Sequence, residues 1–400
     1  MPTRLSVLLY RLELLLTGPI PAVVRRSMYV DVRGAIAYSL FFAIFSFIPI
    51  ILRRLGASVP QLAYYYAISA IGALATGVGI WLMRRFGMAR VAIFGWLVGR
   101  GALVLTALAA NVPALLAIIT VFWVLDSWAS PAYIQAIQHL YPARQRARVV
   151  AMTRLWMVGG ILLVAALAGW VLDHWGFRAM LPLAGVSAVA SALIFRPLLA
   201  AVPDIPPASS PTATSPGHML RADGRLRLYL AGSLLFGLSI VISNPIYPAI
   251  QVDRLNLSYT AVGLLGLVQS GFWFITYLFI GRLADRFGDK LILVAVALIN
   301  ALVMLPYIWA SSAWMLVPAF IAAGIVAAGA DLAGLTVLID IAGPDRAPDY
   351  AALNATLAGA RGLAGPFIGS FLIQLGWPLW TVLALSTGLS LAGAGVLMLL

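Results

Sequence analysis

The amino-acid sequence predicts an all-α membrane protein whose twelve transmembrane helices form two parallel six-helix halves. Of its 400 residues, 62% are hydrophobic and 10% are charged, whereas soluble domains are about half apolar. Twelve apolar runs reach about the 20 residues that a helix needs to cross the hydrocarbon core. Sequence features also recur at a spacing close to half the chain.

The first half begins with residues 1–33, which we expect to form a cytoplasmic segment with an amphipathic helix over residues 5–16 at the membrane surface. Six apolar runs follow and make up the predicted N-terminal bundle, residues 34–201. The runs cover residues 34–52, 61–83, 91–110, 113–139, 149–172 and 179–200.

A cytoplasmic linker, residues 202–224, follows the first bundle. Its Pro, Ser, Thr and Ala content cannot bury an apolar face. The C-terminal bundle, residues 225–400, contains six further runs. They cover residues 227–250, 259–281, 291–310, 314–341, 351–375 and 378–399. An even number of helices in each half makes the repeat parallel, with its axis along the membrane normal.

The repeat is visible as short matches at nearly one spacing. Phe86-Gly87 precedes Phe287-Gly288 by 201 positions. The other matches are Pro142-Ala143-Arg144 with Pro344-Asp345-Arg346, Gly169 with Gly369, and Pro49 with Pro248. Several matches at a consistent spacing indicate an internal duplication of the six-helix unit.

Basic residues predict the orientation of the helices, because Lys and Arg in short loops are retained on the cytoplasmic side. The N-terminal segment, the linker and alternate loops carry most of the 26 basic residues. The opposite loops carry only four, which are Arg53, Arg54, Arg178 and Arg254. We therefore expect a multi-pass protein of the plasma (inner) membrane with both termini in the cytoplasm.

Composition also excludes several classes of function. The chain has no cysteine, which removes disulfides and thiolate metal sites. His139, His174 and His218 lack the spacing of metal ligands or of a catalytic constellation. The net charge of +13 is spread between apolar runs, whereas nucleic-acid binding requires a basic face on a soluble domain. We expect no metal, no cofactor, no enzymatic activity and no nucleic-acid partner.

Residues 281–290, GRLADRFGDK, carry five charged side chains between two long apolar runs. This stretch resembles the loop signature of the major facilitator superfamily, which consists of a glycine, an Asp-Arg pair, a second glycine and a final basic residue. The matching residues are Gly281, Asp285, Arg286, Gly288 and Lys290. The resemblance covers the whole chain, because the family has twelve helices in two sixfold halves joined by a linker. It resembles bacterial exporters of drugs or metabolites.

The stretch WLMRRFGMAR, residues 81–90, holds the equivalent place in the first half, although Arg84 replaces the aspartate of the signature. The signature positions that remain are Arg85, Gly87 and Arg90. The resemblance implies that both loops latch the cytoplasmic side in the outward-facing state. Because Asp285 can face a helix N-terminus, where the macrodipole favours an anion, we predict that the second latch is the stronger.

Five ionisable residues lie within the predicted spans, where a charged side chain costs on the order of 3 kcal/mol or more and is a functional candidate by default. They are Arg100, Asp126, Arg154, Asp331 and Arg361. Asp331 and Arg361 each lie about 20 Å from the cytoplasmic ends of their helices, at about 1.5 Å per residue. Their equal depth predicts an ion pair, which serves either packing or function.

The superfamily lines its central cavity with helices 1, 4, 7 and 10, so the resemblance implies that Asp126 and Asp331 face that cavity. A carboxylate in a partly dry cavity changes its protonation when substrate or an arginine approaches. A proton antiporter requires such a change. The alternative is that Asp126 pairs with Arg100 and serves helix packing.

Residues of helices 4 and 7 are further candidates for contact with a substrate. Asn244 and Tyr247 lie in the segment SNPIYP, where two prolines remove backbone donors and open the helix. Trp123 and Gln135 lie in the fourth apolar run. Each of these side chains either contacts a ligand or packs against a neighbouring helix.

The segment 365–369, GPFIG, resembles the glycine-proline element of the superfamily's antiporters, which carry it in helix 5, whereas here it lies in the eleventh run. The favoured function is proton-coupled efflux of a small organic molecule by alternating access. An uptake permease and a non-transporting or lipid-handling member of the same fold are the alternatives. The expected partners are the substrate, protons and the lipid bilayer, and we expect a monomer.

Overall fold

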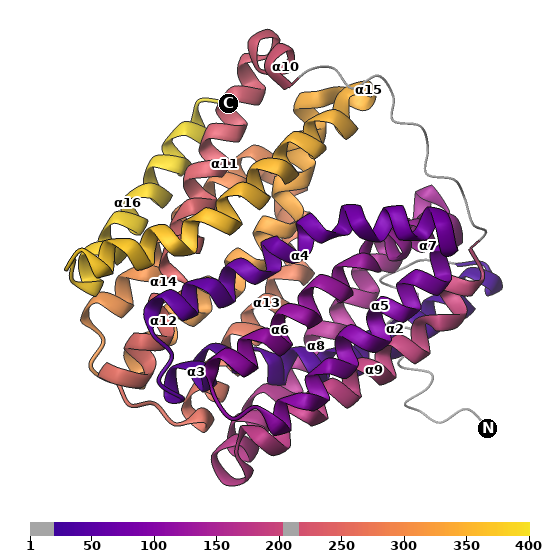
Figure 1. Ribbon diagram of the computed structural model, residues 1–400. Helices are drawn as coiled ribbons and strands as arrows, with labels where there is room; N and C mark the ends of the chain where they lie inside the picture. The colour runs from indigo at the N-terminus through magenta and orange to yellow at the C-terminus, as the bar shows by residue number, and fades with distance from the viewer. Residues whose placement is uncertain (1–19, 203–215) are drawn as a thin grey trace, which may run out of the picture.

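A computed structural model describes residues 20–202 and 216–400 of the chain (Figure 1). The described residues form helices and loops without strands. Twelve of the helices are long and apolar enough to cross a membrane, which confirms the predicted fold class. The amphipathic helix predicted over residues 5–16 lies outside the described residues.

The first half contains six spans, three of which are divided into two segments. The segments are α2 (Ala22–Phe45) with α3 (Ile48–Arg54), α4 (Val59–Phe86), α5 (Met88–Ala102) with the 3-10 helix η1 (Leu103–Leu108), α6 (Val112–Trp128) with α7 (Ser130–Leu140), α8 (Ala143–Trp175), and α9 (Phe177–Ala200). The first helix thus begins at Ala22, before the predicted residue 34. It continues through Asp31 because hydroxyl groups of the protein surround that carboxylate.

The second half repeats this plan after the short helix α10 (Pro216–Ala222). Its segments are α11 (Gly224–Ser243) with α12 (Ile246–Ala249) and the π-helical turn η2 (Ile250–Arg254), α13 (Tyr259–Phe287), α14 (Asp289–Trp309), the 3-10 helix η3 (Ala313–Leu316), α15 (Val317–Gln374), and α16 (Leu379–Met398). Helix α15 contains the predicted tenth and eleventh spans, and its direction changes at Gly343, which has φ 67°.

Prolines lie where several of the spans are interrupted. Helix α11 ends at Ser243, and α12 begins after Pro245, which confirms the opening predicted for the segment SNPIYP. In the first half, α7 begins with Ser130 and Pro131 directly after α6. A proline lacks the backbone N–H that would continue the helix, so the carbonyls of the preceding turn are freed.

The structure extends the sequence repeat to the backbone conformation. Ser58 and Ser258, which are 200 residues apart, cap α4 and α13 by accepting a backbone N–H with the side chain. Gly87 and Gly288 end the same two helices with φ 90° and 82°. Gly56 and Asn256 also share a positive φ, a conformation that glycine and asparagine tolerate best. The two halves therefore have matching loops.

The two halves pack on each other through α4 against α15 and through α8 against α13. Small residues permit the second contact, because a Cβ on Gly169 would lie 2.3 Å from the carbonyl oxygen of Tyr259. In Figure 1 the halves converge at the end that contains α3 and α12 and lie further apart at the end that contains α7 and α10. We call the former the α3–α12 end.

Each half also has its own apolar core. Phe41, Ile48 and Phe122 belong to the core of the first half, and Leu226 and Val296 belong to that of the second. Many other large apolar side chains are exposed; Leu163, for example, is 80% exposed. Such a belt suits a protein whose surroundings are lipid chains, in which exposed apolar surface costs nothing.

Candidate functional site

A cavity of about 790 Å³ lies between the two halves. Its lining comes from α2, α3, α4 and α8 on one side and from α11 to α15 on the other. Its size falls within the range of about 300–1,000 Å³ that small-molecule sites occupy. Tyr38, Arg154, Asn244, Tyr247 and Asp331 are among its lining residues.

A second cavity of about 360 Å³ lies within the first half. Trp123 and Asp126 of α6 line it, and so does Arg154. Tyr38 and Arg154 line both cavities, so the two spaces are neighbours. Gln135, the remaining candidate of the fourth span, lines neither cavity, and its side-chain oxygen is buried without a hydrogen bond.

Arg100 and Asp126 form a buried ion pair. Arg100 Nε donates to Asp126 Oδ1 over 2.8 Å, and Nη1 donates to the carbonyl of Ala188 over 3.2 Å. The guanidinium also lies 4.6 Å from the ring centroid of Trp96, a cation–π contact. These contacts tie α5 to α6 and α9, so the pairing considered for Asp126 is present while its carboxylate still borders the smaller cavity.

The second half has a neutral residue at the position equivalent to Arg100. Asn300 lies 200 residues later, on α14, and its amide donates to Ser239 and Ser390 hydroxyls over 2.9 Å. It therefore ties α14 to α11 and α16 without charge. The constant spacing of the sequence repeat would have identified Asn300 as the residue equivalent to Arg100.

Asp331 and Arg361 do not form the predicted ion pair. Asp331 accepts a hydrogen bond from the Tyr277 hydroxyl of α13 over 2.7 Å and borders the large cavity. Arg361 donates to the carbonyl of Ser233 on α11 and lies against Gly237, where a Cβ would sit 2.1 Å from its Cζ atom. The prediction was wrong because equal depth does not determine which neighbour each helix face meets. Arg361 links two helices and lines neither cavity.

Arg154 is exposed to both cavities. Among the described residues no carboxylate lies within ion-pair distance of it, and its guanidinium contacts Met157 Sδ at 3.8 Å. On the opposite wall of the large cavity, the Tyr247 ring lies 4.5 Å from that of Tyr307. Asn244 borders the cavity beside it. The cavity thus presents a cation from the first half and a carboxylate from the second.

Asp31 was not among the sequence candidates. It is 1% exposed and accepts hydrogen bonds from three hydroxyl groups, those of Tyr133 on α7, Tyr141 directly after α7 and Thr153 on α8. The periodicity of Val24, Met28 and Val32, which share one buried face, is the signal that places Asp31 inside the first helix.

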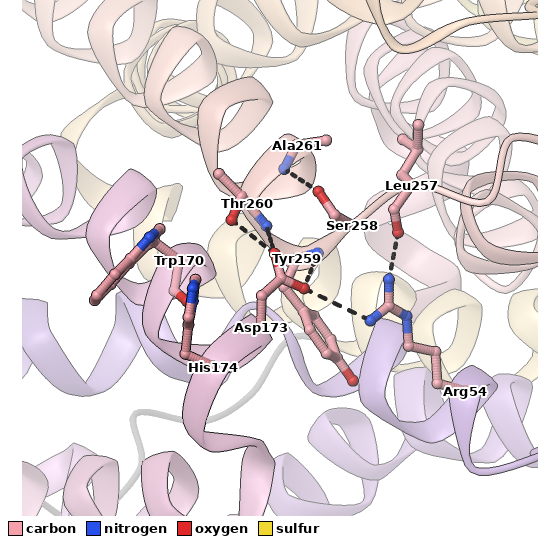
Figure 2. A network of polar contacts seen from close by, with 9 residues as sticks. All are labelled: Arg54, Trp170, Asp173, His174, Leu257, Ser258, Tyr259, Thr260 and Ala261. Atoms are coloured by element: carbon pink, nitrogen blue, oxygen red, sulfur yellow. Dashed lines mark hydrogen bonds and ion pairs between the residues drawn. The ribbon is translucent and has the colours of Figure 1, made fainter.

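A polar network joins the halves at the α3–α12 end. Arg53 Nε donates to both carboxylate oxygens of Asp253 over 3.0 and 2.9 Å. The next residue, Arg54, donates to the carbonyl of Leu257 and lies 3.9 Å from the Asp173 carboxylate (Figure 2). The contacts of Arg53 with Asp253 and of Arg54 with Leu257 join the two halves. The approach of Arg54 to Asp173 lies within the first half.

Asp173, at the end of α8, caps a helix of the other half. Its two carboxylate oxygens accept the backbone N–H groups of Tyr259 and Thr260 over 3.0 and 2.7 Å, and one also accepts the Thr260 hydroxyl over 2.6 Å (Figure 2). These N–H groups are at the first turn of α13, where they lack helical partners and the dipole favours an anion.

The signature loops lie away from this network. Gly288 and Gly87 end α13 and α4, as described above, and Gly281 has open space where a Cβ would be. Asp285, Arg286 and Lys290 are exposed, as are Arg85 and Arg90 in the first half. Within residues 20–202 and 216–400 no hydrogen bond or ion pair involves Asp285, so the contact predicted for the second loop is not present in this structure. Groups of three or more metal-ligating side chains do not occur in the described residues either.

Comparison with known proteins identifies the family. The family model of the Major Facilitator Superfamily matches residues 34–240 and 229–400. A search of curated protein sequences gives no match. Among solved structures, the fold resembles the nucleoside transporter NupG, with a TM-score of 0.67, 13% identity, and coverage of 95% of this chain and 99% of the other. For the D323A variant of NupG the TM-score is 0.70 and the identity is 15%, with coverage of 92% of this chain and 99% of the other.

A third similar structure is a bacterial homologue of the human lysosomal transporter Spinster, described as inward-facing and unoccupied. It has a TM-score of 0.62 and 13% identity, and the alignment covers 95% of this chain and 96% of that one. At these identities the structures show a shared fold. The twelve spans, the two repeated halves and the family match together establish that the chain belongs to the Major Facilitator Superfamily of membrane transporters.

Proposed function

We propose that this protein is a secondary active transporter that moves a small organic molecule by alternating access, coupled to protons and directed out of the cell. The observation that carries the proposal is the 790 Å³ cavity between the halves, which has ionisable side chains at membrane depth and a cross-half polar network at one end. Charges in such a place are costly unless they serve a function.

The distribution of basic residues supports an orientation with the α3–α12 end outside the cell, because arginines and lysines are concentrated in the loops of the other end. With that orientation, the network of Arg53, Asp253 and Asp173 closes the extracellular side, and the free latch at Asp285 belongs to the cytoplasmic side. The conformation is then inward-facing.

The cavity lining favours an amphipathic organic substrate with polar groups. Aromatic rings of Tyr38, Tyr247 and Tyr307 provide flat apolar surface. Arg154 and Asp331 provide one charge of each sign. Because Asp126 is held by Arg100, Asp331 is the cavity carboxylate that is free to exchange a hydrogen bond for a proton or a substrate cation.

Uptake of a polar metabolite is the second candidate. Its support is the run of amide side chains on the second-half wall of the cavity: Asn244, Gln251, Gln269 and Asn300. Amides pair with hydrogen-bonding rings and sugars, and two of the similar structures are described as those of a nucleoside transporter. The same cavity would serve either direction.

Reconstitution of the full chain in liposomes tests both candidates. A pH gradient is imposed, and the flux of a fluorescent lipophilic cation, ethidium, is compared with that of radiolabelled uridine. Gradient-driven ethidium movement that is lost in Asp331→Asn and kept in Asp340→Asn, an exposed carboxylate that lines neither cavity, supports efflux. Gradient-driven uridine entry supports uptake. If neither probe moves, and no member of a wider panel of organic ions and metabolites moves, the proposed transport is contradicted.

A further inference from the structure

We propose that Asp31 is a proton-binding site in which the Thr153 hydroxyl turns to serve either protonation state. Its role in coupling rests on the proposed proton-driven transport, whereas the site itself is argued from α2, α7 and α8 alone. These three helices pack together in the first half (Figure 1).

The Asp31 carboxylate is buried and surrounded by neutral donors. The Tyr133 hydroxyl donates to Oδ1 over 3.1 Å, and the Tyr141 hydroxyl donates to Oδ2 over 3.0 Å. The third donor, the Thr153 hydroxyl, lies 3.3 Å from Oδ2. A carboxylate with 1% exposure and no cation in ion-pair contact among the described residues carries a large desolvation cost, which a bound proton removes.

The groups that surround the Asp31 carboxylate are mostly uncharged, so a bound proton is the main way to neutralise its negative charge. Helix α7 contributes Tyr133, the residue that follows this helix contributes the Tyr141 hydroxyl, and α9 contributes apolar side chains such as Phe195. Helix α8 contributes Thr153 and, acting through space, the charge of Arg154. Because Arg154 is exposed in both cavities, a substrate anion bound there would neutralise its charge and so change its effect on Asp31.

Thr153 makes the site able to hold either state. Its single hydroxyl proton has two acceptors within reach, Asp31 Oδ2 at 3.3 Å and the carbonyl oxygen of Val149 at 3.2 Å. When Asp31 is ionised, Thr153 donates to it. When Asp31 is protonated, Thr153 turns its proton to Val149, and its oxygen accepts the new O–H of Asp31. Every polar hydrogen remains bonded in both states, so neither form leaves a buried unpaired group.

The proton has a route to the interior space. Tyr133 and Thr153, two of the three partners of Asp31, also line the 360 Å³ cavity, whose volume exceeds that of a water molecule, about 30 Å³, several times. The Thr153 hydroxyl, which borders the cavity, relays the proton: it gives its own proton to Asp31 and takes one from water in the cavity, and deprotonation reverses both transfers. Binding the proton therefore requires no opening of the helix packing.

Infrared spectroscopy of the purified full chain in lipid tests the site without a substrate. Spectra recorded over an acid-to-alkaline titration are expected to show a protonated-carboxyl C=O band that titrates in the wild type and in Asp340→Asn, a control at an exposed carboxylate, and is missing in Asp31→Asn. A band that is unchanged in Asp31→Asn overturns the proposal.

Thr153 provides a matched pair of variants for the hydroxyl switch. Thr153→Ser keeps the hydroxyl and is expected to keep the titration midpoint of the band. Thr153→Val has nearly the same shape without the hydroxyl, and its midpoint is expected to shift by about one pH unit, which corresponds to one hydrogen bond. Equal midpoints in wild type, Ser and Val variants would exclude the switch.

Transport assays separate this proposal from the proposed function. If a pH gradient drives ethidium or uridine in the wild type and drives it equally in Asp31→Asn, the transporter is proton-coupled through another group and the role of Asp31 is refuted. If the infrared band identifies Asp31 while no gradient drives any probe, the proton site stands and proton-coupled transport fails.

Discussion

Arg53 and Asp253 form a forked ion pair across the two halves, although they are 200 residues apart in the sequence. Arg53 ends the first span and Asp253 lies in the π-helical turn that ends the seventh. Their side chains are 25% and 45% exposed, so water screens the pair and its contribution is about 1 kcal/mol or less. A contribution of that size still alters a balance between two conformations several-fold.

Arg53→Gln is expected to raise the population open at the α3–α12 end several-fold. The chain has no cysteine, so spin labels at Ala179→Cys and Ser312→Cys report the distance across this end. The exchanged pair, Arg53→Asp with Asp253→Arg, is expected to restore the wild-type distance distribution. A distribution that stays altered in the exchanged variant would show that geometry, and not charge, closes this end.

Asp173→Asn is expected to favour the same opening more strongly than Arg53→Gln. The carboxylate caps α13 across the halves, and charge at a helix N-terminus contributes up to about 2 kcal/mol when partly buried. Ser258→Ala is the matched control, because Ser258 caps the same helix from within its own half. Its loss should lower thermal stability and leave the label distances unchanged. Equal opening in both variants would contradict the cross-half role of Asp173.

Asp285→Asn is expected to leave this conformation intact, because Asp285 makes no polar contact within the described part of the chain. It should instead destabilise the state in which the opposite end closes, and so shift the balance further towards opening at that end. Substitution of Arg84 should shift it less. Single cysteines at exposed loop positions and their labelling rates measure the shift; equal rates in both variants would show that the two latches are equivalent.

Asp126→Asn is expected to lower the stability of the protein by about 3 kcal/mol or more, because it leaves the buried Arg100 charge without its partner. The double variant Arg100→Gln with Asp126→Asn should recover part of this loss, since two neutral amides can pair. Thermal unfolding in detergent measures both. Additive losses in the double variant would show that the two residues act independently.

Tyr350→Phe is expected to lower thermal stability at neutral pH and not at acid pH. Partial burial alone would raise the pKa of Asp223, but hydrogen bonds from the Leu226 N–H, the Tyr350 hydroxyl and the Arg225 N–H, with the charge of Arg346, lower that pKa overall. A lowered pKa stabilises the fold above the unfolded value, about 4, and the gain disappears as the pH falls through the folded value. The difference between variant and wild type should therefore shrink below about pH 4; a constant difference would exclude Asp223 as its cause.

The sequence predicted the twelve helices because a helix that crosses a bilayer requires a long apolar segment, and such segments are visible in the sequence. It also singled out Arg100 and Asp126, since charges within such runs are few, and these two residues form an ion pair in the structure. The start of the first helix was placed too late because Asp31 and its neighbouring arginines resemble an aqueous segment. The hydroxyl groups of Tyr133, Tyr141 and Thr153 explain how the helix continues through it.

The sequence did not determine which helix faces meet at Asp331, Arg361 and Asp173. Asp331 and Arg361 have the right depth and opposite charge, yet they face α13 and α11 respectively. The rotation of a helix about its axis depends on all of its neighbours. The cap on α13 by Asp173 was missed for a similar reason, because only the packing of α8 on α13 brings the two together.

The ion pair at the α3–α12 end joins two equivalent positions of the sequence repeat that differ in charge. Positions 53 and 253 are equivalent in the repeat, and the adjacent pair, Arg54 and Arg254, has kept the same residue. Two identical halves carry the same residue at both positions, so they cannot form an ion pair between those positions. A chain assembled from two copies of one six-helix unit therefore lacked this contact, which arises only where the two halves differ in sequence.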